Sequence, residues 1–491
     1  MSALHRRELL RRSLLAAAGS AAFGSLPFKL AMAQQAGDGR RLLGGDYRAL
    51  VCIYLFGGND PFNAVVPLSG TPRAHYQATR GSLAIPTEQL LPLSPLAGGA
   101  PSDGAPYGLH PAMPGLRTLF NQGQAAIVAN VGPLVRPTTK ALYSAGSVPL
   151  PAQLFSHSDQ TVLWQTPRAD AANRIGWGGR LADIFFASNS NQVLSMNVSL
   201  SGENVFQAGT VISPYFMSPF GVEEIDPIAA AQSWNAQRRA SFDALQNMAH
   251  GHVFERAYAD KMRRMRETTA QVQAALMTAP DTDVVFNPFW AEFGLSTTAN
   301  PRPALPLLAR QLLMAARMIR VRDTLGMSRQ LFFAGLGGFD THDVQLEAQP
   351  ALLTQLSQSL KAFQDVLASP PFAIADRVTT FTASEFGRTL SNNGDGTDHG
   401  WGSHHFVVGG SVRGQRFYGR MPALTASASN PDDAGWGQII PTLAADQYAA
   451  TLAGWYGLSA TDRDAIFPNL VHYNSPILAL QGADLGFLDP V

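Results

Sequence analysis

Carboxylate and imidazole side chains gather in four short segments of this sequence. The segments are GGND (57–60), GGFDTH (337–342), SEFGR (384–388) and DHGWGSHH (398–405). Carboxylates that are packed together repel one another, and a divalent cation that also accepts neutral imidazole is the common way to neutralise them. The sequence therefore predicts a metal site, and the candidate ligands are Asp60, Asp340, His342, Glu385, Asp398, His399 and His404. Zinc, calcium, magnesium and manganese all remain open as the ion.

Each segment also fits a purely structural role. GGND fits a β-turn in which Asp60 caps a helix, and Asp340 with His342 fits a hydrogen-bonded pair that holds a loop. DHGWGSHH fits a surface turn. Asp343 is expected to cap a helix rather than to bind a metal. The metal hypothesis depends on whether the segments meet in the folded chain.

Three of the four segments directly follow predicted β-strands. The strands are RALVCIYLFGG (48–58), RQLFFAGLGG (329–338) and RVTTFTAS (377–384), and predicted helices over 303–323 and 350–369 precede the last two. This alternation predicts an α/β fold, with a doubly wound, mainly parallel sheet flanked by helices. Ligands of such sheets bind beyond the carboxyl ends of the strands, so we expect the segments to meet at one edge.

The rest of the chain adds further predicted elements. A helix over 110–123 precedes the strand AAIVANVG (125–132), and the strand HFVVGGSV (405–412) is expected at or near an edge of the sheet. The segment 233–277 is typical of solvent-facing helix. We expect one domain over 34–491 with a helical insertion at about 233–300.

The N-terminal 33 residues are typical of a twin-arginine export signal. They contain two arginine pairs, an Ala- and Leu-rich stretch and the ending AMA before Gln34. The expected partner during export is the twin-arginine translocase, and the mature protein is expected in the periplasm or outside the cell. The single cysteine, Cys52, forms no intramolecular disulfide and is expected to be buried.

Composition excludes some classes of partner. The 36 Lys and Arg residues are balanced by 36 Asp and Glu residues and are spread along the chain, which argues against a nucleic-acid partner. No run after the export signal reaches the length of a membrane span, so no stable membrane span is expected.

Five motifs together carry a family resemblance. LFGGNDPFNAVVP, LFSHSDQT, GGFDTH, SEFGRT and TDHGWGSHHFVVGG resemble a bacterial exported family described as domain of unknown function 1501. That family is similar to the alkaline phosphatase and sulfatase superfamily. The resemblance implies a doubly wound sheet with a metal site at the strand ends, and hydrolysis of phosphate or sulfate esters on a small or polymeric substrate.

The resemblance also implies roles for the metal-site residues. Asp60 resembles the first metal carboxylate of the superfamily, and Asp340 with His342 resembles its acid and histidine pair. Glu385 lies where the superfamily has Asp followed by His. Here Phe386 follows, so one imidazole ligand is missing. The final histidine is represented by His399 or His404, with Asp398 as a substitute ligand.

The nucleophile implied by the resemblance is Ser158 or Ser156, with His157 between them. No cysteine occurs there, which excludes a formylglycine made from cysteine. Arg388 could hold a phosphate or sulfate oxygen through its planar guanidinium, or could pair with Glu385. The alternative to a hydrolase is a metal-stabilised periplasmic binding or assembly protein without catalysis.

Overall fold

A computed structural model describes residues 47–166, 168–169, 174–222, 228–229, 233–370, 372–473 and 482–490. The expected export signal (1–33) lies outside the described residues. A nine-stranded sheet runs through the protein in the order β11-β5-β10-β9-β1-β8-β6-β7, with β12 also paired to β5. Its strands are β1 (Arg48–Phe56), β5 (Ala125–Gly132), β6 (Asn197–Ser199), β7 (Tyr215–Phe216), β8 (Arg329–Gly337), β9 (Val378–Ala383), β10 (Ser403–Gly409), β11 (Phe417–Gly419) and β12 (Leu443–Ala444). A separate three-stranded sheet consists of β2 (Val65–Pro67), β3 (Leu91–Pro92) and β4 (Tyr107–Leu109).

The large sheet is mixed and mostly parallel, as the sequence predicted. Only β10 runs antiparallel to its neighbours, β5 and β9, among the strands of this sheet that the structure describes. This strand was expected at or near an edge; it is third in the strand order, between β5 and β9, and is therefore not an edge strand. All its residues are buried, and an apolar run reveals burial but not the order of strands.

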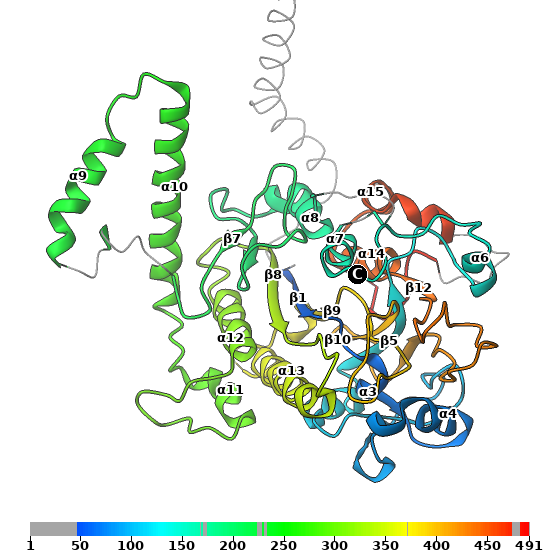
Figure 1. The fold of residues 1–491 in the computed structure, drawn as a ribbon. Coiled ribbons are helices and arrows are strands. Elements are labelled where there is room, and N and C mark those ends of the chain that lie inside the picture. The colour runs from blue at the N-terminus through cyan, green and yellow to red at the C-terminus, as the bar shows by residue number, and fades with distance from the viewer. Residues whose placement is uncertain are drawn as a thin grey trace, which may run out of the picture.

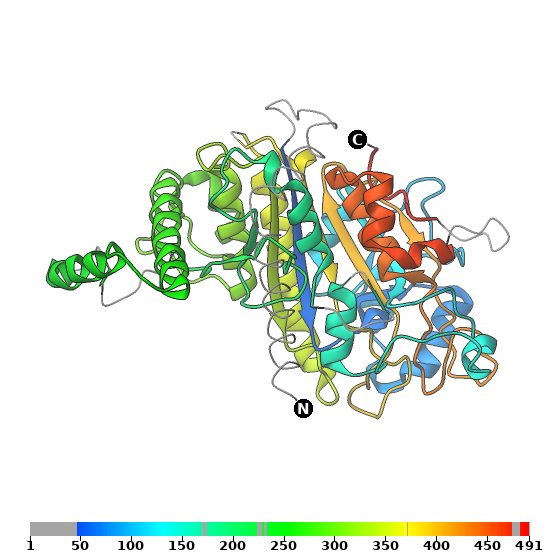
Figure 2. The ribbon, with the colours of Figure 1, turned by 90° about the horizontal axis from the view of Figure 1, so that it is seen from above.

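Helices cover both faces of the sheet (Figure 2). Alternate residues of β1 point to opposite faces, so Val51 and Ile53 pack in one core and Leu50 and Cys52 in the other. The first core includes residues of α5 (Pro114–Asn121), α11 (Asn287–Glu292), α12 (Leu307–Arg320) and α13 (Gln345–Ala368). The second includes residues of α8 (Trp177–Phe185), α14 (Ala445–Tyr456) and α15 (Ala460–Ile466). Cys52 is buried and has no disulfide partner, as expected.

Two helices, α9 (Ala236–Gln246) and α10 (Val253–Leu276), extend away from the sheet (Figure 1). They lie in the segment that the sequence assigned to solvent-facing helix. Arg317 of α12 donates to the carbonyl oxygens of Leu276 and Ala279, at 3.2 and 2.7 Å, and so ties the end of α10 to the main body. Within the described residues, no helix is both long and apolar enough to cross a membrane.

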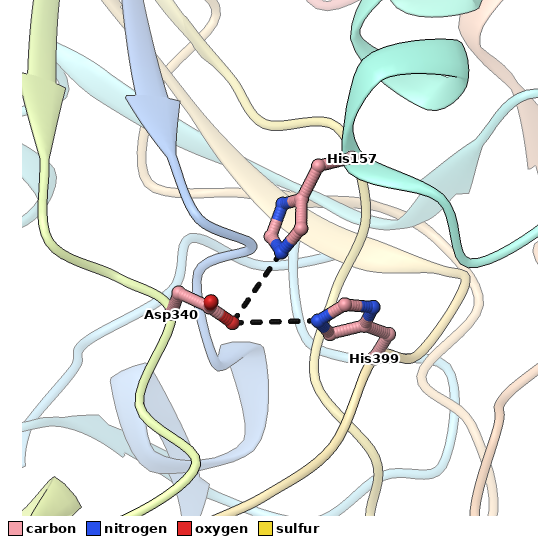
Figure 3. A group of neighbouring side chains, drawn as sticks. All are labelled: His157, Asp340 and His399. Carbon is pink, nitrogen blue, oxygen red and sulfur yellow. Dashed lines mark ion pairs between the residues drawn. The ribbon is translucent and has the colours of Figure 1, made fainter.

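Three neighbouring strands end at the same edge of the sheet. β1 lies between β8 and β9 and is parallel to both, with Phe56 opposite Gly337 and Tyr54 opposite Ala383. The segments GGND, GGFDTH and SEFGR therefore leave the sheet side by side. The remaining helices are α3 (Pro61–Ala64), α4 (Gly70–Arg80), α6 (Lys140–Ser144) and α7 (His157–Gln165), and α7 begins close to this edge (Figure 3).

Candidate metal centre

Three histidines surround one carboxylate at this edge of the sheet. Asp340 follows β8, His157 is the first residue of α7, and His399 lies in the loop between β9 and β10 (Figure 3). The Nε2 atoms of His157 and His399 each lie 3.4 Å from Asp340 Oδ1. One ligand atom from each of these three residues lies within 4.8 Å of the others. His342 adds a further imidazole, with its Nε2 3.0 Å from the same oxygen and 3.0 Å from His399 Nε2.

The other ring nitrogen of each imidazole, Nδ1, forms a hydrogen bond with an oxygen atom. The pairs are His157 with Glu385 Oε1 at 2.9 Å, His342 with Asp398 Oδ1 at 2.9 Å, and His399 with the Phe155 carbonyl at 2.7 Å. Carboxylate and carbonyl oxygens only accept, so Nδ1 carries the proton and Nε2 of the neutral ring presents a lone pair. A second-shell oxygen on Nδ1 is the usual arrangement of a metal-ligating histidine.

The lone pairs repel one another unless a cation lies among them. His342 Nε2 and His399 Nε2 face each other at 3.0 Å, and His157 Nε2 is buried without a hydrogen-bond partner. A divalent metal would bind these nitrogen atoms and the Asp340 oxygen together. His157, Asp340, His342 and His399 therefore fit a metal ion by their chemistry, and this donor set is one that zinc and other first-row divalent ions accept.

Protons compete with the metal for these nitrogen atoms. The hydrogen bond to Glu385 raises the pKa of His157, with a contribution from the negative charge of that carboxylate. Burial lowers the pKa of His399, which favours the neutral ring. Since a metal needs the unprotonated Nε2, protonation of His157 in acid should weaken metal binding.

Arg388 orients the carboxylate rather than an incoming ligand. Its guanidinium is buried, and Nη1 donates to Asp340 Oδ1 at 2.7 Å and to the Gly57 carbonyl at 3.2 Å. Nε and Nη2 both donate to Thr397. Burial raises the pKa of Asp340, but the hydrogen bond and charge of Arg388 outweigh it and lower that pKa. Neither expected role of Arg388 matches this geometry, because its nitrogen atoms are used by the protein and its ion-pair partner is Asp340, not Glu385.

The structure places Asp60 outside this cluster. Its Oδ1 accepts from the Phe62 amide at 3.0 Å, which caps α3, and its Oδ2 accepts from Gln345 Nε2 at 2.6 Å. The same oxygen forms an ion pair with Arg80, and both side chains are almost fully buried. We therefore remove Asp60 from the ligand set, since the helix cap that the sequence left open is its observed role.

Two other expected ligands contact the histidines but not the central oxygen. Glu385 is buried and accepts from His157 and from the Gly57 amide at 2.7 Å. Asp398 is exposed and accepts from His342. Both carboxylates therefore orient imidazoles. His404 is buried beside Phe62, and its Nδ1 accepts from the Asn130 amide at 3.0 Å, so it is not part of this cluster.

The expected nucleophiles face a different carboxylate. Ser156 Oγ donates to Asp159 Oδ2 at 2.6 Å, and the exposed Ser158 Oγ lies 3.4 Å from the same oxygen. The cap expected at Asp343 is also not observed, because the residue before α13 is Val344, in a left-handed conformation and with no side-chain cap. Asp343 is exposed.

His157 contacts the motif SEFGR through Glu385 and Phe386. Phe386, which lies where the resemblance implied a histidine, packs its ring 4.9 Å from the ring of His157 and 4.6 Å from that of His399. The sequence analysis placed His157 with Ser156 and Ser158 among the candidate catalytic residues and not among the metal ligands. Its one local signal was its position at the start of a predicted helix, and its separation of more than 180 residues from Asp340 hid the contact.

The cluster is open to solvent on one side. The exposed fraction of the side chain is 47% for Asp340, 43% for His342, 37% for His157 and 24% for His399. Structural metal sites are usually closed by protein ligands, whereas catalytic sites keep a position for water or substrate. This exposure is what a site that receives a ligand requires.

Comparison with known protein families identifies the chain without assigning an activity. The family model described as protein of unknown function (DUF1501) matches residues 47–433, and the protein belongs to this family. The candidate metal ligands His157, Asp340, His342 and His399 lie inside the matched range. A comparison with curated proteins found no match to the chain.

Proposed function

We propose that this DUF1501 family member is an exported, metal-dependent hydrolase that acts on phosphate or sulfate esters. The observation that carries the proposal is the convergence of three imidazole Nε2 atoms on one oxygen of Asp340 in a cluster that solvent reaches. A sealed structural ion would need no exposed face.

A bound divalent ion would polarise the ester and lower the pKa of a water molecule. The residues of the chain prepare the site for it. Glu385, Asp398 and the Phe155 carbonyl keep the proton of each imidazole on Nδ1. Arg388 holds Asp340 in its ionised form and in one orientation. These contacts make the donor set available before the ion arrives, which reduces the cost of organising it.

The ester class is supported by the motifs and their place in the fold. The five motifs resemble the alkaline phosphatase and sulfatase superfamily, and the cluster lies beyond the carboxyl ends of parallel strands, where ligands of α/β sheets bind. Because Ser156 and Ser158 face Asp159, we propose water as the nucleophile in place of either serine. The two arginine pairs before an apolar stretch support twin-arginine export to the periplasm as part of the same proposal.

The test is a metal analysis combined with an ester assay. The chain from 34 to 491 would be purified without chelator, its bound metal measured, and its hydrolysis of phosphate monoesters, phosphate diesters and sulfate esters assayed with and without added zinc, magnesium, manganese or calcium. We expect bound metal and metal-dependent hydrolysis. Both should be lost in His157→Ala and His399→Ala and kept in His75→Ala, which changes an exposed histidine of α4.

Two outcomes would contradict the proposal in different ways. Metal binding that depends on His157 and His399, without hydrolysis of any of these esters, would favour the non-catalytic binding or assembly protein. Absence of metal binding under all these conditions would refute the metal centre itself.

A further inference from the structure

An exposed tryptophan lies in a loop that contacts the backbone of His399. Trp436 has 89% of its surface exposed, and it lies in the left-handed region with φ of 57°. The residues on either side, Gly435 and Gly437, also have positive φ, 139° and 81°. A bulky residue in this conformation is unusual, and such conformations persist where the surrounding structure holds them.

Several hydrogen bonds hold the backbone of the loop around Trp436. Asp433 is buried, and its Oδ1 accepts from the amides of Gly435 and Gly437 at 2.8 and 3.0 Å. The amide of Ala434 donates to the Gln438 carbonyl, and the amide of Gln438 donates to the Gly435 carbonyl, both at 3.0 Å. The indole is therefore exposed because the backbone directs it outward, not because the loop lacks contacts.

The same loop contacts the backbone of two segments that carry residues of the site. Gln438 Nε2 donates to the carbonyl of His399 at 3.3 Å, and the amide of Leu390, two residues after Arg388, donates to the Gly437 carbonyl at 2.8 Å. Ala434 packs in the small apolar cluster that includes Phe155, whose carbonyl orients His399. These contacts fix the backbone of the Trp436 loop relative to His399. The side chain of Trp436 does not pack in the hydrophobic core.

We propose that Trp436 is a stacking platform for a sugar ring, and that the substrates of the metal centre are phosphate or sulfate esters of carbohydrates. This inference rests on the proposed hydrolase and names its substrate class. An aryl or acyl group gains affinity from burial on all sides, so it needs a walled pocket, whereas Trp436 is almost fully open. A pyranose has an apolar C–H face that suits one flat ring, while its hydroxyl groups stay in water.

The test compares glycans and variants. Wild type, Trp436→Ala and Trp436→Phe would be titrated calorimetrically with dextran sulfate and with unmodified dextran of the same length. The control is Trp234→Ala. Trp234 is also exposed, at 72%, but it lies just before α9, one of the two helices that extend away from the sheet. We expect Trp436→Ala to weaken dextran sulfate binding by about tenfold, Trp436→Phe to retain most of it, and Trp234→Ala to bind as wild type.

Kinetics give a second readout that a purely structural role would not move. For a sulfated oligosaccharide, Trp436→Ala should raise KM by about tenfold and leave kcat within about twofold, because the platform holds the sugar and not the reacting atoms. For p-nitrophenyl sulfate, which contains no sugar, both constants should stay as in wild type. Circular dichroism and melting temperature would show that the variant is folded.

Each outcome decides one question. Glycan binding that is equal in Trp436→Ala and wild type, or no glycan binding by wild type, would overturn the sugar platform. Binding that depends on Trp436 in a protein that hydrolyses no ester would support the platform and refute the hydrolase. Hydrolysis of p-nitrophenyl sulfate without any preference for sugar esters would support the hydrolase and overturn the substrate class.

Discussion

Asp60 and Asp340 follow neighbouring parallel strands, β1 and β8, yet their environments are opposite. Asp60 is 1% exposed, and its oxygens accept from Arg80, Gln345 and the Phe62 amide. Asp340 is 47% exposed, and one of its oxygens faces Arg388 and three imidazoles that bring lone pairs rather than protons. Asp60 has all the donors that it needs, whereas the atoms around Asp340 fit a metal ion that would bind the carboxylate and the imidazoles together.

This difference shows how the same local motif serves two purposes. A carboxylate supplied with donors by the protein stabilises the fold and has little reason to bind a metal. A carboxylate that also faces imidazole lone pairs gains from a metal ion that binds all of these atoms together. Substitutions on the two sides of this comparison should therefore affect different properties.

The largest loss of stability is expected from substitution of the buried Asp60. Asp60→Ala leaves the buried Arg80 without its carboxylate and removes the cap of α3, so the free energy of unfolding should fall by about 3–5 kcal/mol. Urea denaturation of wild type and variant measures this. An Asp60→Ala variant that unfolds like wild type would show that the buried pair of Asp60 and Arg80 is unimportant for stability.

A smaller change in stability is expected when a metal ion is added and binds the solvent-exposed cluster around Asp340. An ion that binds only the folded chain should raise the free energy of unfolding by about 2.7 kcal/mol at a free concentration 100 times its Kd. His342→Ala should bind less metal per chain and show a reduced gain in melting temperature. Equal metal content and equal gain in wild type and His342→Ala would mean that His342 only holds its loop.

The buried histidines of β10 are expected to make the stability of the fold depend on pH. Burial lowers the pKa of His405 to about 3, with a contribution from His404, so the folded chain keeps this ring neutral at pH 5. The unfolded chain takes up a proton near pH 6.5, and stability is lost as the pH falls below that value. Between pH 7 and pH 5 this one group should remove about 2 kcal/mol.

His405→Phe tests this contribution, because phenylalanine keeps an aromatic ring between Trp164 and Tyr448. Urea denaturation at pH 7 and pH 5 should show a smaller loss of stability in the variant than in wild type. The same loss in both proteins would place the acid sensitivity elsewhere.

The smallest effect is expected at Asp343. Although it is adjacent to His342, it is exposed and does not cap α13, so Asp343→Ala should change the free energy of unfolding by less than about 0.5 kcal/mol. Metal content should stay as in wild type. A loss of metal in this variant would mean that Asp343 belongs to the metal site.

Periodicity and composition were enough to predict much of the fold. The strands β1, β8 and β9 and the helices α12 and α13 follow from apolar patterns that depend on nearby residues alone. Their alternation predicted a mostly parallel sheet, and parallel strands necessarily end at the same edge. The sequence therefore indicated that Asp340, His342 and His399 belong to segments that meet.

Only the tertiary structure decided which partner each side chain has. The exclusion of Asp60 depends on Arg80 and Gln345, the inclusion of His157 depends on where α7 begins, and β10 lies inside the sheet although its pattern does not reveal its neighbours. These contacts join residues that are 20 to 285 positions apart. Local pattern determines what a residue can do, but a hydrogen bond or a metal ligand requires atoms within about 3 Å, and only the folded chain sets such distances.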